Sequence, residues 1–299
     1  MLRSAWARRA GLLDADTDCV RLLCEEEPPR GVAIDLFADV AVVQARAEVE
    51  TAPLVAALLE LGPVRTVYVR SVGVAGAEVP AAPAAGSPVE RLEVVENGVR
   101  FLIEPASTSV GLFLDARDNR RRVRELASGR RVLNTFAHTC GFSVCAGLGG
   151  AVEVVSVDAA RRYLDWGRAN WALNPIDAAI EHVTLCDDVI AAVERAERNQ
   201  RSYDLIILDP PTFGRSKRGR WQIKRDLGRL FRATVAVAAP QALVFLCTNH
   251  RGTSLSDLEA EFAAAASARP FEVVERPSLP LDFTASPGYA KSVWIRLGS

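Results

Sequence analysis

The stretch RVLNTFAHTCGFSVCAGLGGAVEVVSVD, residues 131–158, indicates how the larger part of this chain folds. Its two ends, RVLNTF and VEVVSVD, are short apolar runs typical of buried strands, and GFSVCAGLGG between them is typical of a short helix. A strand, a helix and a second strand in this order form the repeating unit of a parallel sheet covered by helices. We therefore predict an α/β domain that extends outward from these residues.

The same alternation of strands and helices continues toward the C-terminus. Further strands are predicted at HVTLCD (182–187), YDLIILD (203–209) and QALVFLCTN (241–249), and helices at 159–174, 188–200 and about 226–238. Two last strand-like runs, FEVVERPS (271–278) and AKSVWIRL (290–297), are expected to pair antiparallel as an edge hairpin. Seven strands in this order predict a Rossmann-like sheet with helices on both faces.

The N-terminal residues predict a separate, smaller α+β domain. Strands are predicted at 19–23, 32–36, 38–46 and 64–71, a helix at 51–61, a flexible loop at 75–89 and a hairpin of 89–97 with 98–105. Asn97-Gly98 between two alternating apolar runs is a strong hairpin signal. We expect this small domain, which would bind the substrate, at residues 1–108 and the parallel-sheet domain at residues 109–299.

Composition excludes several classes of protein. The chain has 299 residues, of which 49% are hydrophobic and 24% charged, so it is neither collagenous nor disordered. Six cysteines without a CxxC pair or zinc-like spacing predict buried thiols in a reducing cytoplasm and no metal site. The N-terminus lacks the apolar run of a secretory signal, and no apolar stretch reaches the roughly 20 residues that cross a membrane.

Candidate binding residues follow the strands, because ligands of a parallel sheet bind beyond the carboxyl ends of its strands. Asp158, Asp187 and Asp209 each stand at such an end. Asp158 could accept hydrogen bonds from both hydroxyls of a ribose, or it could cap the next helix. The loop after the first strand lacks GxGxxG, which argues against a dinucleotide. A ligand with a ribose and no phosphate fits better, and S-adenosylmethionine is the common one.

The tripeptide Asp209-Pro210-Pro211 is the sharper signal of chemistry. Two prolines make a rigid extended loop and remove two N–H donors, so we expect the carbonyls of this loop to be free to accept from a base. Phe213 could then stack on the face of that base. A plain turn is the alternative interpretation.

Four segments resemble the class I S-adenosylmethionine-dependent methyltransferases that modify bacterial large-subunit ribosomal RNA. They are GLFLDARDNRR (111–121), residues 131–158, YDLIILDPPTFGRSK (203–217) and NHRG (249–252). Residues 19–44 are similar to the small substrate domain of the branch that methylates cytosine C5. The details DPPTF, GLFLD and NHRG are closer to the branch that makes 7-methylguanosine.

This resemblance implies roles for individual residues. Asp158 would bind the ribose, and Asp187 would accept from the adenine amino group. Asp115 and Arg117 would close over the methionine end of the cofactor. The stretch that would wrap the methionine part includes Asn134, Phe136, Thr139, Gly141, Phe142 and Ser143. The residues that would border the methyl group and the target base are Asp209, Pro210, Pro211 and Phe213, and Asp209 would also contact the cofactor. The family usually has a glycine where this chain has Cys140.

Cys247 and two histidines allow more than one interpretation. Formation of 5-methylcytosine needs a thiolate that adds to carbon 6, and the cysteine of that branch follows this same fifth strand. Counted along the strand, its place falls near Asn249, so we predict that Cys247 is a buried strand residue. Guanine N7 needs neither a thiolate nor a base, which favours 7-methylguanosine. His138 and His250 could contact a ligand or only support their loops.

Two basic clusters predict an RNA partner. Residues 208–232 carry eight basic and two acidic residues, a net charge of +6, whereas the whole chain has −1. Residues 115–131 carry seven basic and three acidic residues, a net charge of +4. The segment Arg215–Arg232 directly follows DPPTF, and we expect it to bind phosphates. A solvated helix face would have the same composition.

The sequence therefore predicts an enzyme that transfers a methyl group from S-adenosylmethionine to a base of RNA. Large-subunit (23S) ribosomal RNA is the expected substrate, with guanine N7 favoured over cytosine C5. Two alternatives remain open. One is a small-molecule or protein methyltransferase on the same scaffold, and the other is a non-catalytic RNA-binding or assembly factor.

Overall fold

The computed structural model of this chain describes residues 1–72, 82–216, 219–266, 269–283, 285–286 and 288–299, with only the backbone of residues 215 and 216. It divides into two compact units. Unit 1 comprises Met1–Arg117 and Leu279–Pro287, and unit 2 comprises Asp118–Ser278 and Gly288–Ser299. The first part of unit 1 thus ends at Arg117, whereas the predicted small domain ends at residue 108. The sequence analysis also assigned Leu279–Pro287 to the larger domain, but these residues belong to unit 1.

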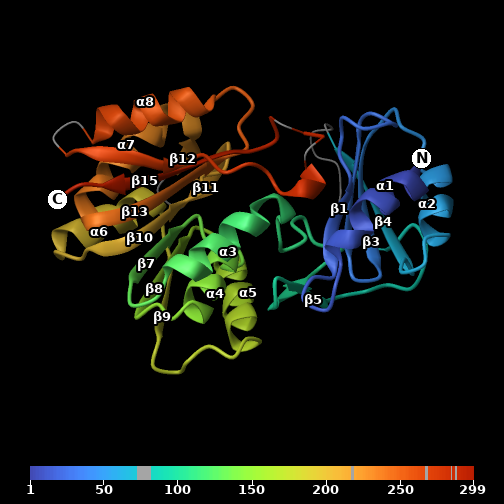
Figure 1. Cartoon of the computed structure of the whole chain (residues 1–299), viewed down its shortest axis with the longest axis horizontal. Coiled ribbons are helices and arrows are strands. Elements are labelled where there is room, and N and C mark those ends of the chain that lie inside the picture. The colour runs from blue at the N-terminus through green and yellow to red at the C-terminus, as the bar shows by residue number, and fades with distance from the viewer. Residues whose placement is uncertain (73–81, 217–218, 267–268, 284, 287) are drawn as a thin grey trace. The chain divides into compact units, whose positions relative to one another are not determined.

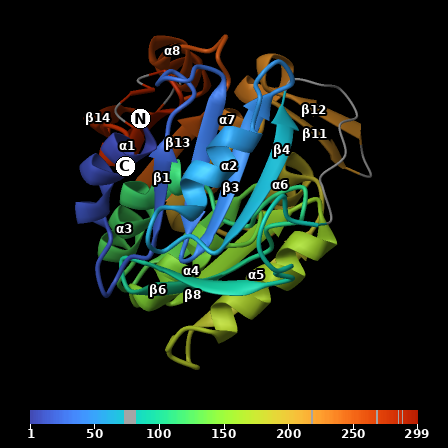
Figure 2. The ribbon, with the colours of Figure 1, turned by 90° about the vertical axis from the view of Figure 1, so that its right-hand side faces the viewer.

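Unit 1 is built on a four-stranded sheet. Its strands, in spatial order, are β1 (Cys19–Leu23), β2 (Val32–Phe37), β3 (Val40–Arg46) and β4 (Thr66–Val72). The first three pair antiparallel, whereas β3 and β4 are parallel and are joined by α2 (Ala52–Leu59). Figure 2 shows α2 in front of this sheet. Together with α1 (Leu2–Arg9), it covers the apolar side chains of one face of the strands, which form a single core.

A two-stranded hairpin follows in unit 1, as predicted. It joins β5 (Leu92–Glu96) to β6 (Val99–Ile103) through Asn97 and Gly98, whose φ angles are 51° and 73°. Positive φ at both loop residues suits the twist of a two-residue hairpin, which explains the Asn-Gly pair. The predicted flexible loop 75–89 lies partly outside the described residues. Its described end is not free, since Ala85 forms a bridge with Val67 of β4.

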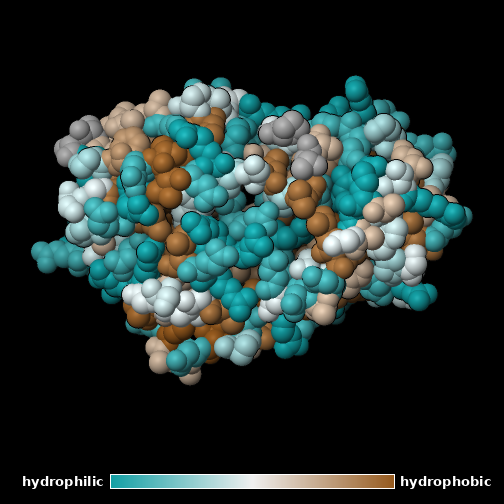
Figure 3. Space-filling model, in the orientation of Figure 1, coloured by the Kyte–Doolittle hydropathy of each residue, from teal (hydrophilic) through white to brown (hydrophobic). Residues whose placement is uncertain are grey.

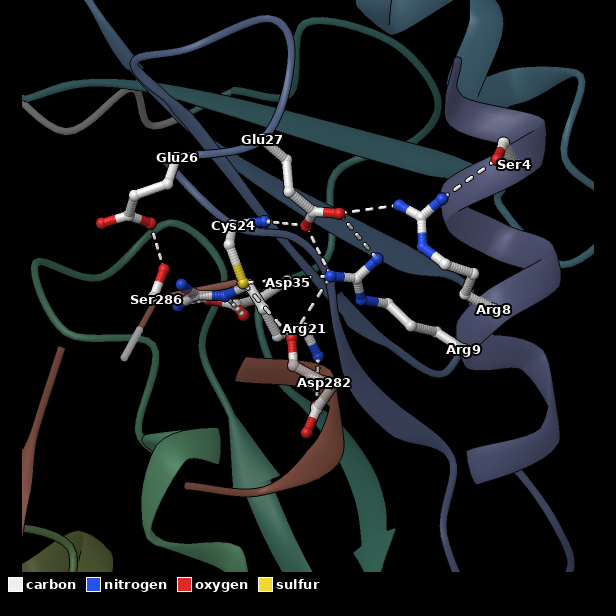
Figure 4. Close-up of polar contacts among 10 residues, drawn as sticks. All are labelled: Ser4, Arg8, Arg9, Arg21, Cys24, Glu26, Glu27, Asp35, Asp282 and Ser286. Carbon is white, nitrogen blue, oxygen red and sulfur yellow. Dashed lines mark hydrogen bonds and ion pairs between the residues drawn. The ribbon is translucent and has the colours of Figure 1, made fainter. Parts of the chain in front are cut away.

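The opposite face of the four-stranded sheet carries buried charged side chains (Figure 4). Arg21 of β1 and Asp35 of β2 form an ion pair at 2.5 Å. Asp282 lies in the short helix η3 (Leu281–Phe283) and accepts from the backbone N–H of Arg21 at 2.8 Å and from the Arg117 guanidinium at 3.0 Å. The segment Leu279–Pro287 therefore belongs to unit 1 because it supplies the carboxylate that faces these buried arginines.

Unit 2 holds the seven-stranded sheet that the sequence predicts. The strands are β7 (Arg131–Thr135), β8 (Glu153–Asp158), β9 (Glu181–Cys186), β10 (Tyr203–Leu208), β13 (Ala238–Thr248), β14 (Phe271–Glu275) and β15 (Lys291–Leu297). Their spatial order is β14-β15-β13-β10-β7-β8-β9. All neighbours from β13 to β9 are parallel, and β15 is antiparallel to both of its neighbours. The last two strands pair as predicted, but β15 lies inside the sheet and only β14 is an edge strand at this end, with β9 at the other.

Helices cover both faces of this sheet (Figure 1). On one face, α6 (Val189–Arg198), α7 (Ile223–Val237) and α8 (Leu255–Ala265) share a core with apolar side chains of the strands, such as Ile206 of β10. On the other face lie α4 (Gly141–Leu148) and α5 (Arg161–Ala172), and Phe142 of α4 packs against Phe245 of β13 with ring centroids 5.6 Å apart. The central strands β7, β8, β10 and β13 are thus buried on both faces, which explains their continuous apolar runs.

Several elements were not predicted. They are α1, α3 (Arg117–Leu126), α8 and the hairpin of β11 (Phe213–Ser216) with β12 (Gly219–Gln222). The inward positions of α3 are filled by Asn119, Arg120 and Val123, so the helix lacks an apolar periodicity. By contrast, α8 begins with a capping box of Ser254 and Asp257, a signal that the sequence does carry.

The faces of the two units seen in Figure 3 are largely hydrophilic, with hydrophobic residues in smaller areas among them. This agrees with the burial of most large apolar side chains in the cores of the two units. Within the part of the chain that the structure describes, no helix is both long and apolar enough to cross a membrane.

Candidate functional site

The candidate site lies in unit 2, at the carboxyl ends of the parallel strands. The chain runs from β7 outward to β8 and β9, and then returns to β10 on the other side of β7. The loops after β7 and β10 therefore leave the sheet in opposite directions, which is where an open parallel sheet forms its ligand-binding crevice. Both loops carry residues that the sequence singles out.

The loop after β7 has an unusual backbone. Phe136, His138 and Cys140 have φ angles of 52°, 49° and 61°, a left-handed conformation that side chains rarely adopt. The loop is held in place by the neighbouring strand, because Ala137 N–H donates to the Val157 carbonyl at 2.9 Å. Alternating left-handed residues turn the chain sharply into α4, which begins at Gly141.

Asp158, the last residue of β8, holds this loop and the start of the next helix. Its carboxylate accepts from the backbone N–H of His138 at 2.9 Å and from that of Ala160 at 2.8 Å. Burial raises the pKa of the Asp158 carboxyl, although these hydrogen bonds act in the opposite direction. The N-cap of α5 is Ala160, so the alternative in which Asp158 caps this helix is wrong.

Asp187 follows β9 next to Asp158. Its backbone N–H donates to the Asp158 carbonyl at 3.1 Å, which sets the two carboxylates on adjacent strand ends. One carboxylate oxygen of Asp187 accepts from the N–H of Asp188 at 2.8 Å, and the other pairs with Arg195 at 2.7 Å. Asp188 is the N-cap of α6. The structure therefore brings Asp158 and Asp187 together at the edge of the sheet.

A chain of buried hydrogen bonds leads away from Asn134 through the sheet. The Asn134 amide donates to Ser143 Oγ at 2.8 Å, Ser143 Oγ lies 2.7 Å from Ser156 Oγ, and Ser156 Oγ lies 2.9 Å from His182 Nε2. Burial lowers the pKa of His182 to about 4, so this ring is neutral. Ser156 and His182 were missed by the sequence analysis. Polar residues inside the runs of β8 and β9 were the available signal.

Cys140 and Thr139 complete the loop after β7 and are buried. Burial raises the pKa of the Cys140 thiol to about 12, so it stays protonated at neutral pH. The Thr139 carbonyl accepts from the side chain of Asn170 at 2.9 Å, which ties the loop to α5. His138 packs on Tyr163 with ring centroids 4.4 Å apart, and burial lowers its pKa to about 4.

The loop after β10 contains the Asp-Pro-Pro sequence. Pro210 is buried, Pro211 is exposed, and the Phe213 side chain is 72% exposed at the start of β11. The Pro211 carbonyl accepts from the indole N–H of Trp221 at 2.6 Å. The expectation that the proline carbonyls are free is therefore wrong for Pro211. The ring of Trp221, in β12, also lies 5.0 Å from that of Phe136, so Trp221 joins the two loops.

Asp115 and Arg117 belong to unit 1, whereas the residues described above belong to unit 2. Asp115 is in the short helix η2 (Leu114–Ala116). The Arg117 guanidinium is buried, where it pairs with Asp282 at 3.0 Å and donates to the Cys19 carbonyl at 2.9 Å. These contacts give Arg117 a structural role in unit 1, and its role toward a cofactor stays a prediction.

Cys247 and His250 lie at and beyond the end of β13. Cys247 is 7% exposed and pairs in register with Ser292 of β15, as expected for a buried strand residue. His250 Nδ1 lies 2.7 Å from Thr253 Oγ1, and the His250 carbonyl accepts from Lys291 at 2.8 Å. These contacts support the turn after β13.

The basic segment forms the hairpin β11–β12 and the first turns of α7. Arg225 pairs with Asp226 at 2.9 Å and Arg229 with Glu194 at 2.6 Å, so part of its charge is neutralised. Arg220, Lys224 and Arg232 are exposed. Lys217 and Arg218 lie outside the described residues, and of Arg215 only the backbone is described.

Comparison with known proteins shows that this chain is similar to methyltransferases. Residues 77–292 match the family model of S-adenosylmethionine-dependent methyltransferases. The ribosomal RNA large subunit methyltransferase K/L of Alteromonas mediterranea is 32% identical over 94% of this chain and 41% of its own length. The ribosomal RNA large subunit methyltransferase K of Neisseria meningitidis is 35% identical over 64% of this chain and 52% of its own length. The chain thus spans about half or less of these relatives.

Solved structures share the fold. SMU.776, described as a methyltransferase and crystallised in complex with SAH, superposes with a TM-score of 0.87 at 24% identity, covering 99% of this chain and 80% of its own. The SAM-dependent methyltransferase of Agrobacterium tumefaciens has a TM-score of 0.68 at 22% identity, covering 90% of this chain and 87% of its own.

Proposed function

Because this chain belongs to the family of S-adenosylmethionine-dependent methyltransferases, we propose that it transfers a methyl group from S-adenosylmethionine to a base of large-subunit ribosomal RNA. The observation that carries this proposal is that Trp221 joins two loops at the crevice of the sheet. Trp221 donates to the Pro211 carbonyl in the loop after β10 and packs on Phe136 in the loop after β7, which would border the cofactor. An exposed Phe213 and a basic hairpin follow directly.

The donors and acceptors at this edge suit the cofactor. A carboxylate has about four acceptor positions. In Asp158 the N–H groups of His138 and Ala160 take two of them, and the N–H of Ala159 also acts on the carboxyl, which leaves acceptor capacity for a ribose hydroxyl. Asp187 stands on the adjacent strand end, where it would accept from the adenine amino group. The remaining proposed contacts come from the loop and the start of α4, and they involve Asn134, Phe136, Thr139, Gly141, Phe142 and Ser143.

The residues after β10 would orient the target base. When bound, S-adenosylmethionine supplies a methyl group that its sulfonium already activates. Asp209 and Pro210 would border this methyl group, and Phe213 would stack on the base and exclude water from it. Guanine N7 carries a lone pair and needs no general base, so alignment of the base is the main task of the protein. We therefore favour guanine N7 over cytosine C5 as the acceptor.

The RNA would be held by the exposed cations beside this loop. The segment Arg215–Arg232 follows Phe213 without interruption, so phosphates bound there would lie next to the base that Phe213 contacts. The relatives in Alteromonas and Neisseria are named as ribosomal RNA methyltransferases, which supports the choice of RNA over a small molecule or a protein. A cytoplasmic location, where ribosomes are assembled, is part of this proposal.

The test is methyl transfer from radiolabelled S-adenosylmethionine to unmodified large-subunit ribosomal RNA, followed by nucleoside analysis. We expect label in 7-methylguanosine. Label in 5-methylcytosine would correct the acceptor atom only. Cofactor binding by calorimetry without transfer to this RNA, to transfer RNA or to protein would contradict the proposed activity and favour an assembly factor.

A further inference from the structure

Trp221 connects three parts of the candidate site. It lies in β12, on the side of the hairpin that leads into α7. Its indole N–H donates to the Pro211 carbonyl at 2.6 Å, and its ring lies 5.0 Å from that of Phe136 at an interplanar angle of 56°. A single half-buried side chain therefore contacts the loop after β10, the loop after β7 and the basic hairpin.

The loop after β10 depends on such contacts more than most loops do. Pro210 and Pro211 have no N–H, so this stretch can be anchored only through its carbonyls and its side chains. The structure shows two carbonyl anchors. Trp221 holds the Pro211 carbonyl, and the backbone N–H of Ile223 donates to the Thr212 carbonyl at 3.2 Å. Both donors come from the second strand of the hairpin or from the residue that directly follows it.

Gly214 of β11 lies close to both Trp221 and Pro211. A Cβ added to Gly214 would lie 3.5 Å from the Cβ of Trp221 and 3.6 Å from the Cγ of Pro211. Both distances correspond to ordinary van der Waals contact, so the first strand, the indole and the proline ring lie close together. This proximity adds to the hydrogen bonds from Trp221 and Ile223 that link the hairpin to the loop after β10.

We propose that Trp221 is a positioning residue for methyl transfer, which sets the Asp-Pro-Pro loop against the loop after β7 and couples both to the RNA-binding hairpin. This inference rests on the proposed function. RNA phosphates held by the hairpin would be kept in register with Pro211, and thus with the place where the base meets the methyl group. Trp221 would act on the rate of transfer through alignment, since it has no part in proton or methyl movement.

The test replaces the donor but keeps an aromatic ring, in Trp221→Phe. We expect the single-turnover rate of methyl transfer at saturating RNA and cofactor to fall about tenfold or more, because small displacements of reacting groups reduce rates steeply. The dissociation constants of RNA and of S-adenosylmethionine should stay within about twofold of the parent, because the contacts to both remain. If Trp221 only stabilised the fold, the folded variant would keep the transfer rate of the parent.

Trp171→Phe is the matched control. Trp171 lies at the end of α5 and stacks on His182 at a centroid distance of 4.1 Å, so this variant loses a comparable indole from the same unit. Both variants are assayed at a temperature at which each is folded by circular dichroism. We expect the control to lose thermal stability but to keep the transfer rate of the parent within about twofold.

Hydrogen exchange provides a readout that does not depend on RNA activity. In Trp221→Phe, amides of residues 212–216 and 223 should exchange severalfold faster than in the parent, and in Trp171→Phe they should not. Unchanged exchange at these amides, or an unchanged transfer rate in an active enzyme, would overturn the role of Trp221. A parent that does not methylate RNA would instead contradict the proposed function.

Discussion

Cys140 fits beneath α5 because the residue that faces its thiol is Gly167. A Cβ added to Gly167 would lie 2.3 Å from Sγ and 2.7 Å from Cβ of Cys140, closer than real atoms approach. The backbone of Cys140 is left-handed, with a φ angle of 61°, a conformation that favours glycine. The larger residue in the loop is thus accommodated by the absence of a side chain in the facing helix.

Gly167→Ala should therefore destabilise the protein. Alanine normally stabilises a helix interior relative to glycine by about 1 kcal/mol, so a loss would have to come from the clash with Cys140. We expect a loss of about 1–3 kcal/mol in the free energy of unfolding, as for other overpacked sites, and weaker cofactor binding. Chemical denaturation and calorimetry measure these two quantities.

The double variant Cys140→Gly with Gly167→Ala is the decisive comparison. It removes the Sγ and Cβ atoms that cause the clash and should recover most of the lost stability. Gly11→Ala, where nothing lies within 4 Å of the added Cβ, serves as control. Failure of the double variant to recover would mean that the Thr139 backbone, 3.2 Å from the added atom, sets the limit instead.

Asp158→Ala should weaken the binding of S-adenosylmethionine at least tenfold while the protein remains folded. The variant loses an acceptor for the ribose hydroxyls, and hydrogen bonds to a charged group contribute about 1.5–3 kcal/mol each. It also releases the N–H groups of His138 and Ala160. Asp158→Asn keeps one carbonyl acceptor, so its affinity for S-adenosylmethionine should lie between those of the parent and of Asp158→Ala. Unchanged affinity in a folded Ala variant would leave Asp158 with a structural role alone.

The stability of the protein should fall when pH decreases from 6.5 toward 4, in part because of His182. Burial, assisted by the charge of Arg168, lowers the pKa of His182 from 6.5 to about 4. The unfolded chain thus binds this proton at a higher pH than the folded one, so the contribution is complete above 6.5 and is lost on acidification. The shift corresponds to roughly 3–4 kcal/mol at most. His182→Gln should show a shallower decline in urea unfolding, and an identical decline would exclude His182 as its source.

Cys247→Ala should reduce stability by about 1–2 kcal/mol, as for a small truncation in a core. Methyl transfer at a temperature at which the variant is folded should stay within severalfold of the parent. A nucleophilic cysteine could not be removed in this way, since no other group would add to carbon 6. A covalent adduct of the parent with 5-fluorocytosine RNA, or an inactive Cys247→Ala variant, would move the protein to the cytosine-C5 branch.

Replacement of Arg215, Lys217, Arg218 and Arg220 by alanine should weaken RNA binding and reduce its salt dependence. Each lost phosphate contact should lower the slope of log affinity against log salt by about 0.7–0.9. Cofactor affinity should change little. Arg276→Ala with Arg296→Ala removes cations that are paired with Glu259 and Glu272, and should leave the slope unchanged. The same slope in both variants would mean that the hairpin does not contact phosphates.

The sheet of unit 2 could be predicted because its central strands are buried on both faces and therefore consist of continuous apolar runs. The helix α3 could not, because Asn119 and Arg120 occupy its inward positions. The Arg120 guanidinium lies 6.0 Å from the centre of the Phe142 ring. The residues around Arg120 in the sequence do not predict this contact. Long polar side chains can cover apolar surface in this way, which hides a helix from a search for apolar periodicity.

The site was predictable in part for a related reason. The strand-end aspartates follow from topology alone, because parallel strands bring their carboxyl ends to one edge. The partners of these residues do not follow from it. The hydrogen bond from Trp221 to Pro211 needs the hairpin to fold back, and the segment that forms this hairpin has the composition of a solvated loop. The basic residues of this segment suggested an RNA partner, but their polarity also kept the hairpin β11–β12 from being predicted.

The late position of Leu279–Pro287 in the chain has a consequence for protein synthesis. Arg21 is translated 261 residues before Asp282, the carboxylate that its backbone contacts and that also neutralises Arg117. A nascent chain that ends before residue 279 would contain the strands of unit 1 but would leave Arg117 without this partner. Domains usually complete their folding in the order in which they are made. Here unit 1 would reach its final state only after residues 118–278 of unit 2 have also been made.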